Sequence, residues 1–194
     1  SIREHGYAVV PDLDDAFESI RARKTPEEIA HIRDAQQANE AAMAEAERML
    51  AESTVDEDGT LRLDGEVLTS ERVKGAIERT LLDSGFALDE TIVASGPQGA
   101  IPHERGSGPI SADEPVIVDI FPRSKTTKYH ADMTRTFVKG EPAPEIEEFH
   151  TLTQEAKAAA MAATEPGATG EDVHDAVCDV YEDAGYPTIR SDES

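Results

Sequence analysis

The chain has few cysteines, few basic residues and no long apolar runs. A single cysteine, Cys178, in 194 residues excludes an internal disulfide bond. There are 18 Lys and Arg residues against 41 Asp and Glu residues, which gives a net charge of −23. Such a charge repels nucleic acid and anionic membranes, so we expect neither as a partner. No apolar stretch approaches the roughly 20 residues that a membrane-spanning helix requires.

Several common catalytic and targeting signals are also missing from the sequence. It contains no phosphate-binding P-loop, no Rossmann glycine fingerprint, no HExxH zinc motif and no nucleophile elbow. No positively charged and apolar leader is present, and the simplest expectation is a cytoplasmic protein.

The acidic surplus favours a protein adapted to high salt. Self-repulsion between so many carboxylates is tolerable chiefly where dissolved ions screen it, which predicts a halophilic character. Disorder is the alternative explanation, but periodic apolar residues run through most of the chain and argue against it. A chain of this length is expected to form one compact domain or part of one.

Capping signals mark the predicted helices. Residues 25–28 supply a capping Thr, a Pro at the first helical position and an acidic residue three positions after the cap. They predict a long helix that ends near Ala51. Its predicted apolar stripe comprises Ile29, Ile32, Gln36, Met43, Ala46 and Leu50. Three further helices are predicted, from Thr69 or Ser70 to Gly85, from residues 141–144 to near Pro166, and from Thr169 to Gly185.

Apolar, β-branched runs predict three strands, at residues 91–94, 115–121 and 129–138. Between the first two lies the Gly-rich and Pro-rich segment 96–108, which predicts a loop next to a strand end. A loop held by a rigid sheet suits binding. Two helices, three strands and two more helices indicate an α+β fold rather than βαβ alternation.

Two aspartates interrupt this strand pattern. Asp119 directly follows the β-branched residues 116–118, and Asp132 directly precedes the run 133–136. Because Asp is a poor strand former, its place at two strand ends needs a further reason. Residues that lie near each other across an antiparallel pair share a face, so both carboxylates should point to one side. Oxygen ligands of this kind suit Mn, while Fe, Co and Zn are also accepted.

These aspartates and the Pro102-His103 step together resemble a known family pattern. P-H, then I-V-D, then D-M-T-R-T resembles the metallo-aminopeptidases with the pita-bread (creatinase/aminopeptidase) fold, peptidase family M24. The similarity is strongest to the Xaa-Pro aminopeptidase and prolidase (Xaa-Pro dipeptidase) branch. It covers roughly residues 25–194 and implies a partial pita-bread fold, with an antiparallel sheet covered by helices on one face. The family usually has ten residues between its aspartates and this chain has twelve, an even insertion that preserves the shared face.

The resemblance implies a role for each site residue. Asp119 would bind one metal ion through both oxygens, Asp132 would bridge two, and Thr134 would orient a ligand carboxylate. The two divalent ions, Mn or alternatively Co, Fe or Zn, would share a hydroxide that attacks the N-terminal Xaa-Pro bond of a peptide or dipeptide. His103 would contact the scissile peptide and stabilise its tetrahedral intermediate. His130 is a further candidate ligand from its spacing, although the family has no ligand there.

One His and two Glu that complete the family's metal centre have no match in this chain. The triplet Glu165-Pro166-Gly167 resembles a family motif, but it lies between two predicted helices and indicates a helix stop. We therefore expect residues 25–194 to be an incomplete metallopeptidase catalytic domain that is truncated on its C-terminal side. Residues 1–24 would be the tail of a preceding domain or a linker. Alone, such a chain should bind metal weakly or not at all and hydrolyse little.

Two other functions remain open alongside the Xaa-Pro peptidase. A non-catalytic relative would keep the fold to bind peptides or partner proteins, but the retention of both aspartates favours the enzyme. A methionine aminopeptidase would combine the same chemistry with a different specificity pocket. The D-M-T-R-T-F run and the apparent preceding domain favour the Xaa-Pro branch. We also expect a homodimer, because an exposed sheet edge invites association with another chain.

Overall fold

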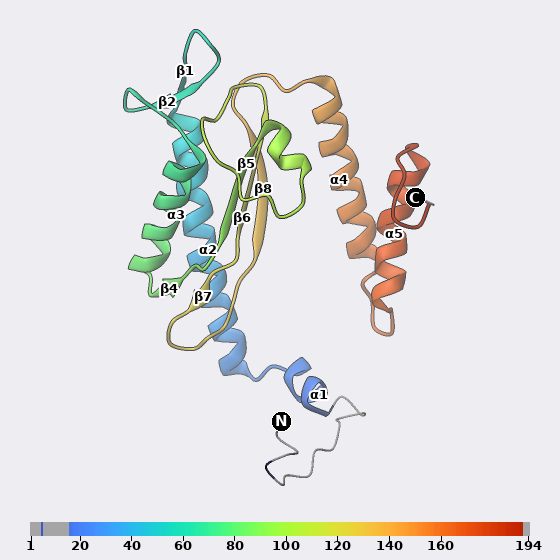
Figure 1. Cartoon of the computed structure of the whole chain (residues 1–194). Coiled ribbons are helices and arrows are strands. Elements are labelled where there is room, and N and C mark those ends of the chain that lie inside the picture. The colour runs from blue at the N-terminus through green and yellow to red at the C-terminus, as the bar shows by residue number, and fades with distance from the viewer. Residues whose placement is uncertain (1–4, 6–15, 192–194) are drawn as a thin grey trace.

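The computed structural model describes residue 5 and residues 16–191. Its principal elements are α1 (Ala16–Ala22), α2 (Pro26–Glu52), α3 (Ser70–Asp83), β5 (Thr91–Ser95), β6 (Pro115–Ile120), β8 (Met133–Val138), α4 (Pro144–Ala163) and α5 (Gly170–Asp183) (Figure 1). Short elements are β1 (Thr54–Val55), β2 (Leu61–Leu63), β3 (Glu66–Val67), β4 (Phe86–Ala87), the 3-10 helix η2 (Gly96–Ala100) and β7 (Arg123–Ser124). This mixture confirms the α+β prediction.

The predicted helix starts are confirmed by their caps. Thr25 accepts a hydrogen bond from the backbone N–H of Glu28, and the Glu28 carboxylate accepts one from the backbone N–H of Thr25 at 2.7 Å. Such a capping box satisfies two N–H groups that the helix itself leaves free. Thr169 and Asp172 form the same arrangement at the start of α5, and Thr69 caps α3.

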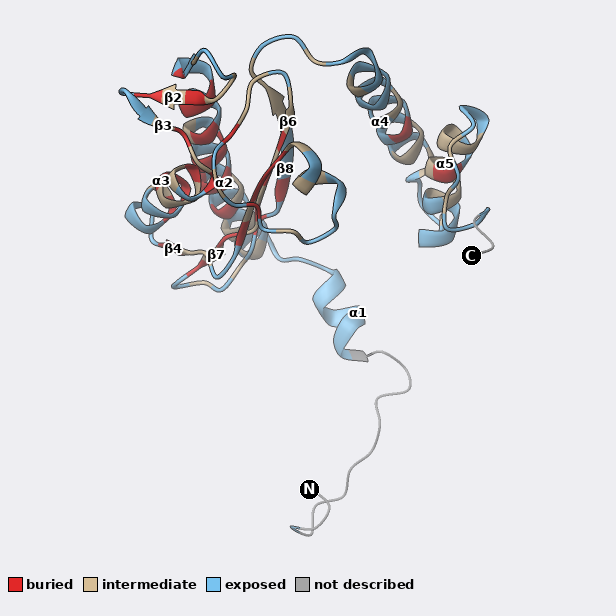
Figure 2. Ribbon diagram, turned by 45° about the horizontal axis from the view of Figure 1, so that its top comes forward, coloured by how far each residue is buried: buried red, intermediate tan, exposed pale blue. Residues whose placement is uncertain are grey.

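A three-stranded antiparallel sheet in the order β5-β6-β8 positions the candidate site residues. Helices α2 and α3 cover one face of this sheet, whereas the α4–α5 hairpin stands on its other side (Figures 1 and 2). Along β6 the burial alternates, because Val116, Val118 and Ile120 point at the helices and the residues between them do not. The face that carries Ile117 and Asp119 is called the open face below.

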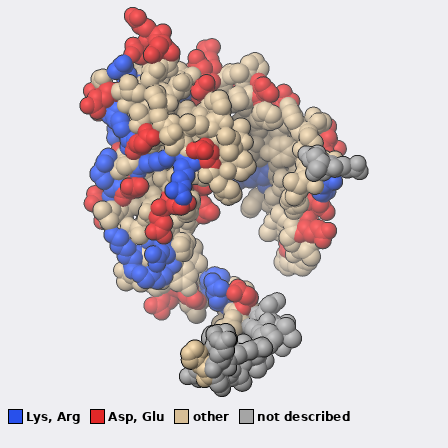
Figure 3. Space-filling view, in the orientation of Figure 1, with Lys and Arg blue, Asp and Glu red and all other residues tan. Residues whose placement is uncertain are grey.

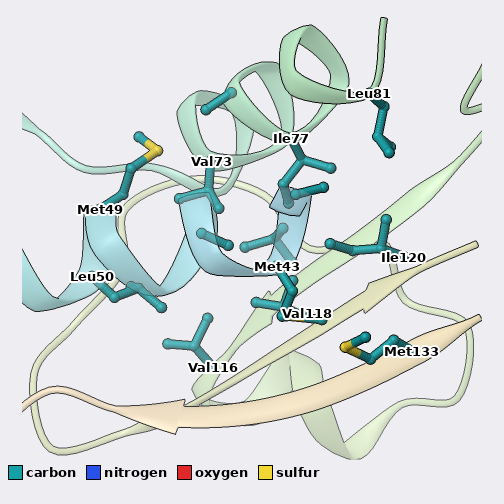
Figure 4. Close-up of a cluster of buried hydrophobic side chains, with 14 of the residues drawn as sticks. Met43, Met49, Leu50, Val73, Ile77, Leu81, Val116, Val118, Ile120 and Met133 are labelled. Carbon is teal, nitrogen blue, oxygen red and sulfur yellow. The ribbon is translucent and has the colours of Figure 1, made fainter. Parts of the chain in front are cut away.

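The main hydrophobic core lies between the sheet and helices α2 and α3 (Figure 4). Its labelled members are Met43, Met49, Leu50, Val73, Ile77, Leu81, Val116, Val118, Ile120 and Met133. Ile77, Val118 and Ile120 are completely buried. The open face therefore rests on a rigid, close-packed layer.

The apolar stripe predicted for α2 was wrong in its first turns. The buried face comprises Ala35, Ala38, Asn39, Ala42, Met43, Ala46, Met49 and Leu50, whereas Ile29 is 38% exposed and Gln36 is only half-buried. Small residues dominate this face because α2 lies close against α3 and the sheet. The first turns of the helix extend past the sheet, so apolar residues there have little to pack against (Figure 1).

The third predicted strand begins later than expected. Residues 129–132 lie outside β8, which starts at Met133. Pairing in the β6–β8 register nevertheless continues beyond the two strands, because Ala131 bonds to Pro122, His130 is bridged to Arg123 and the backbone N–H of Ser124 donates to the Tyr129 carbonyl at 2.9 Å. The two aspartates are therefore joined by a hairpin whose turn lies at residues 125–128, and its β7 arm also pairs with β4.

The α4–α5 hairpin buries far fewer residues than the sheet and helices α2 and α3. The two helices contact each other extensively, but Ala156 and Cys178 are their only fully buried residues. Glu165-Pro166-Gly167 lies just after α4 and turns the chain, with the backbone N–H of Ala168 donating to the Glu165 carbonyl. The predicted helix stop is confirmed.

Acidic side chains are spread over much of the surface in Figure 3, whereas basic ones gather along the side formed by α3 and the β4–β7 end. Among the described residues, no helix is both long and apolar enough to cross a membrane. The expected preceding domain or linker at residues 1–24 falls mostly outside the described residues and stays a prediction.

Candidate metal centre

Asp119 and Thr134 face each other across β6 and β8. They are direct partners in the antiparallel register, and Thr134 Oγ1 donates to Asp119 Oδ1 at 2.7 Å. This hydrogen bond fixes the Asp119 carboxylate on the open face and leaves its second oxygen available. It is the orienting contact expected of Thr134. The role of Asp119 as a metal ligand stays a prediction.

The backbone around Asp119 is held by two residues that the sequence did not single out. Thr91 Oγ1 on β5 donates to the Asp119 carbonyl at 2.7 Å. Asn39, fully buried on α2, donates through Nδ2 to the next carbonyl, that of Ile120, at 2.9 Å. Buried polar contacts of this kind fix one geometry, because breaking them would leave a buried group unpaired. A polar residue within a buried helical face is the signal that could have drawn attention to Asn39.

Asp132 lies on the same open face, immediately before β8. Ala131 and Met133 are buried against the core, whereas Asp132 and Thr134 are exposed on the opposite side. The backbone N–H of Ala131 donates to the Pro122 carbonyl at 3.2 Å, so pairing continues up to this point. Asp132 is thus a diagonal neighbour of Asp119, at a distance of roughly 7 Å between Cα atoms. Two carboxylates at this distance can bind the same metal ion or two neighbouring metal ions.

The segment that leads into Asp132 is tied to α2 by Tyr129. Its hydroxyl donates to Glu28 Oε1 at 2.6 Å, and its ring lies 5.8 Å from that of His31. The Tyr129 hydroxyl, followed by the Thr25 backbone N–H, lowers the pKa of Glu28 to about 2. The same bond raises the pKa of Tyr129. The charge-assisted contact therefore persists far below neutral pH.

Replacing Tyr129 by Phe should raise the pKa of Glu28 from about 2 towards its ordinary value of 4.5. A depressed pKa contributes stability above pH 4.5 that disappears as pH falls through about 2, so the variant should lose most of this pH dependence. Carboxyl ¹³C shifts of Glu28, followed by NMR, give the pKa directly. Tyr181→Phe on α5 should leave it unchanged. An unaltered Glu28 pKa in the Tyr129 variant would contradict the assignment.

His103 lies in the predicted loop, in a turn that follows η2. It is exposed and adopts a left-handed backbone conformation with φ of 64°. The helix η2 packs on the open face, because a Cβ on Gly99 would lie 3.1 Å from Ile117 Cδ1. Ile117 is two residues from Asp119 on the same face of β6. The loop that carries His103 therefore packs through η2 on the open face, two residues along β6 from Asp119, and the substrate contact of His103 stays a prediction.

His130 lies before β8 but continues the same pairing, because it is bridged to Arg123 in the β6–β8 register. It is exposed, as Asp132 is, with the buried Ala131 between them. His130 also lines a cavity of about 500 Å³ beside Arg21, Lys24 and Tyr129, and its role as a further ligand stays a prediction.

The donor set fits part of a metal centre. Within residues 16–191 neither Asp119 nor Asp132 forms an ion pair with Lys, Arg or His, so both carboxylates can accept a cation. Hard oxygen donors of this kind favour divalent ions. The described part of the chain nevertheless brings together no group of three or more His, Cys, Asp or Glu side chains that could hold a metal. The two aspartates thus make up a candidate partial site, and their role as metal ligands stays a prediction.

An apolar cavity of about 410 Å³ adjoins this partial site. Ile117 and Thr136 contribute its sheet side, Gly99 its loop side, and Ile146 and Phe149 of α4 its far wall. Ile117 and Thr136 stand directly opposite each other in the register, next to the Asp119–Thr134 pair. The open face therefore combines a polar end and an apolar end.

Comparison with known proteins gives a consistent result. Residues 30–192 match metallopeptidase family M24. An Xaa-Pro dipeptidase of Pyrococcus furiosus is 28% identical over 175 residues, which cover 90% of this chain and 46% of that protein. The solved structure of the prolidase from Pyrococcus furiosus superposes with a TM-score of 0.74 at 26% identity, covering 90% of this chain and 48% of the other. Dipeptidase PepE from Mycobacterium ulcerans gives a TM-score of 0.71 at 29% identity, over 88% of this chain and 43% of the other.

These matches confirm the partial pita-bread fold predicted from the sequence. These relatives match this chain over most of its length. The chain, however, spans only about half of their length. The family match covers well over half of this chain, and it includes both aspartates, Thr134 and His103. The chain therefore belongs to metallopeptidase family M24.

Proposed function

We propose that the chain forms part of a metal-dependent exopeptidase that hydrolyses the N-terminal Xaa-Pro bond of peptides or dipeptides. Asp119 and Asp132 lie on one open face and have no cationic partner among residues 16–191, which supports this proposal. Relatives named prolidase and Xaa-Pro dipeptidase support the substrate class. The whole protein would be tested for release of the N-terminal residue from an Xaa-Pro dipeptide in the presence of Mn²⁺.

Each residue of the site would have a separate task in this reaction. Asp119, oriented by Thr134, and Asp132 would hold two divalent ions, with Mn as the proposed metal. When bound, such ions lower the pKa of a water molecule and polarise the peptide carbonyl. His103 would donate a hydrogen bond to the peptide oxygen as negative charge develops on it. The open face would orient the peptide between the ions and the loop.

We further propose that these 194 residues alone bind metal weakly and hydrolyse little, because they provide two of the five family ligands. Calorimetric titration of the 194-residue chain with Mn²⁺ should show a dissociation constant weaker than about 0.1 mM. The Asp119→Asn variant should weaken even this binding. Tight stoichiometric binding by the unmodified chain would contradict the incomplete-site proposal.

A non-catalytic relative that binds peptides or partner proteins is the second candidate. The absence of a three-ligand group from the described residues favours it. The two candidates differ in one measurable property, because a binding protein would retain a peptide without cleaving it when Mn²⁺ is supplied.

We also propose that the whole protein is a homodimer and that it works in a salt-rich cytoplasm. Sedimentation of the whole protein would test the dimer.

A further inference from the structure

The loop that carries His103 is built from two arms. One arm leaves β5 through η2, and the other returns through residues 104–108 to the bridge at Pro109. His103 lies between them with φ of 64°, a conformation that non-glycine residues adopt at a cost. Such a conformation persists only where the surrounding contacts determine it. The contacts that hold each arm are therefore informative.

The returning arm is anchored on the body of the protein. The backbone N–H of Val93 donates to the Arg105 carbonyl at 3.0 Å. From α3, Lys74 Nζ donates to the Gly106 carbonyl at 2.6 Å, and the Glu71 carboxylate accepts from the Gly108 N–H at 3.1 Å. These three contacts come from two different elements. They make the returning arm a fixed base.

The outgoing arm is joined to the returning arm by a backbone hydrogen bond from the Glu104 N–H to the Ile101 carbonyl at 3.1 Å, which closes the turn around His103, and by one side chain. Gln98 Nε2 donates to the Ser107 carbonyl at 3.0 Å, while Gln98 Oε1 accepts from the Ser107 N–H at 3.0 Å. The carboxamide thus pairs with both backbone groups of one residue, as a neighbouring strand would. Among the residues that the structure describes, no other side-chain hydrogen bond joins residues 96–101 to residues 104–108.

We propose that Gln98 is a positioning residue whose paired hydrogen bonds with Ser107 close the loop and fix the turn that carries His103. The proposal rests on the proposed function, since it assigns Gln98 a part in presenting His103 to the peptide. Preorganisation of a hydrogen-bond donor matters because a donor that must first be ordered stabilises the developing charge less. Gln98 itself would touch neither substrate nor metal.

The test replaces Gln98 by Met, which preserves the length of the side chain and removes both hydrogen bonds. Gln154→Met is the matched control, because Gln154 is exposed on α4 and its carboxamide contacts only His150 one turn away, at 3.5 Å. In the 194-residue chain, ¹⁵N relaxation should show order parameters for residues 99–104 falling from about 0.85 to below about 0.6. In the whole protein with Mn²⁺, kcat should fall about tenfold with KM unchanged.

Each outcome decides a separate part of the proposal. The paired hydrogen bonds between Gln98 and Ser107 are called the clamp. Unchanged order parameters in the Gln98 variant would show that the clamp does not order the loop, whatever the activity. A loosened loop with unchanged kcat in an active protein would overturn the positioning role. Equal losses of kcat in the Gln98 and Gln154 variants would also overturn the positioning role. Absence of peptidase activity in the wild-type protein would overturn the proposed function and with it the positioning role, while the relaxation data would still decide the clamp.

Discussion

Replacing Asp132 by Asn should abolish the Mn²⁺-dependent hydrolysis of an Xaa-Pro dipeptide by the whole protein. Asn has the shape of Asp but lacks the negative charge and one of the two carboxylate oxygens that would hold divalent ions. Loss of those ions would remove the chemistry that they supply, a water molecule of lowered pKa and a polarised peptide carbonyl. The expected fall in kcat/KM is about a thousandfold or more, which corresponds to about 4 kcal/mol of transition-state stabilisation.

The fold should tolerate this substitution. Asp132 is exposed and forms no ion pair within the described residues. The Asp132→Asn variant should therefore unfold at the same temperature as the wild type. Asp83→Asn, at the exposed end of α3, is a suitable control that should retain full activity. An Asp132→Asn variant with near wild-type activity would eliminate the dinuclear mechanism. Loss of activity accompanied by unfolding would contradict the tolerance expected here.

Asp119→Asn examines the same centre from its other side. An Asn side chain still has an oxygen that can accept the hydrogen bond from the Thr134 hydroxyl, so the local geometry should survive while the negative charge is lost. The paired result matters because Asp119 is fixed by contacts from β5 and β8, and the next residue by a contact from α2, whereas Asp132 stands at a strand end. Similar activity losses in the two variants would point to a ligand role rather than a structural one.

The sequence determined the elements well where its signals were local. The capping Thr at positions 25, 69 and 169 each marks a helix start in the structure. These signals work because a cap depends on residues within one turn. Apolar, β-branched runs also located the strands that carry Asp119 and Thr134, and the two strands pair in the structure.

Predictions that depended on distant partners were less successful. The pairing of β7 with β4 was not predicted, because the two segments lie far apart in the sequence. Ile29 looked like a core residue because its spacing fits a helix, yet no sheet reaches it. No pattern within one sequence reveals which strand a helix will face.

Within the site, the sequence identified the residues with chemical groups but missed those that hold them. Asp119, Asp132 and Thr134 are found on one face, as the pairing predicted. Asn39 and Gln98 act through backbone atoms 81 and 9 residues away, respectively. Such contacts leave no periodic trace, because any residue supplies a carbonyl. Structure was therefore needed to see how the ligand strand and the loop are held.

Replacing Gly106 by Ala should destabilise the protein strongly, because the substitution meets two separate obstacles. Gly106 has φ of 75°, and a Cβ there would lie 1.8 Å from the carbonyl oxygen of Val93. The left-handed conformation alone costs an L-residue about 1–2 kcal/mol. The clash is with the backbone of a buried strand, which cannot move aside without disturbing the core. Together they should lower the free energy of unfolding by about 4 kcal/mol.

Gly108→Ala separates these two costs within the same loop. Gly108 has φ of 79°, but no atom lies within 4 Å of a Cβ placed there, so only the conformational cost of about 1 kcal/mol should appear. Urea unfolding of both variants and of the wild type gives the comparison, and the difference of about 3 kcal/mol measures the close approach of the loop to β5. Equal destabilisation of the two variants would show that the loop does not pack against Val93. Since His103 lies three residues before Gly106, such a result would also remove the fixed base on which the clamp by Gln98 depends.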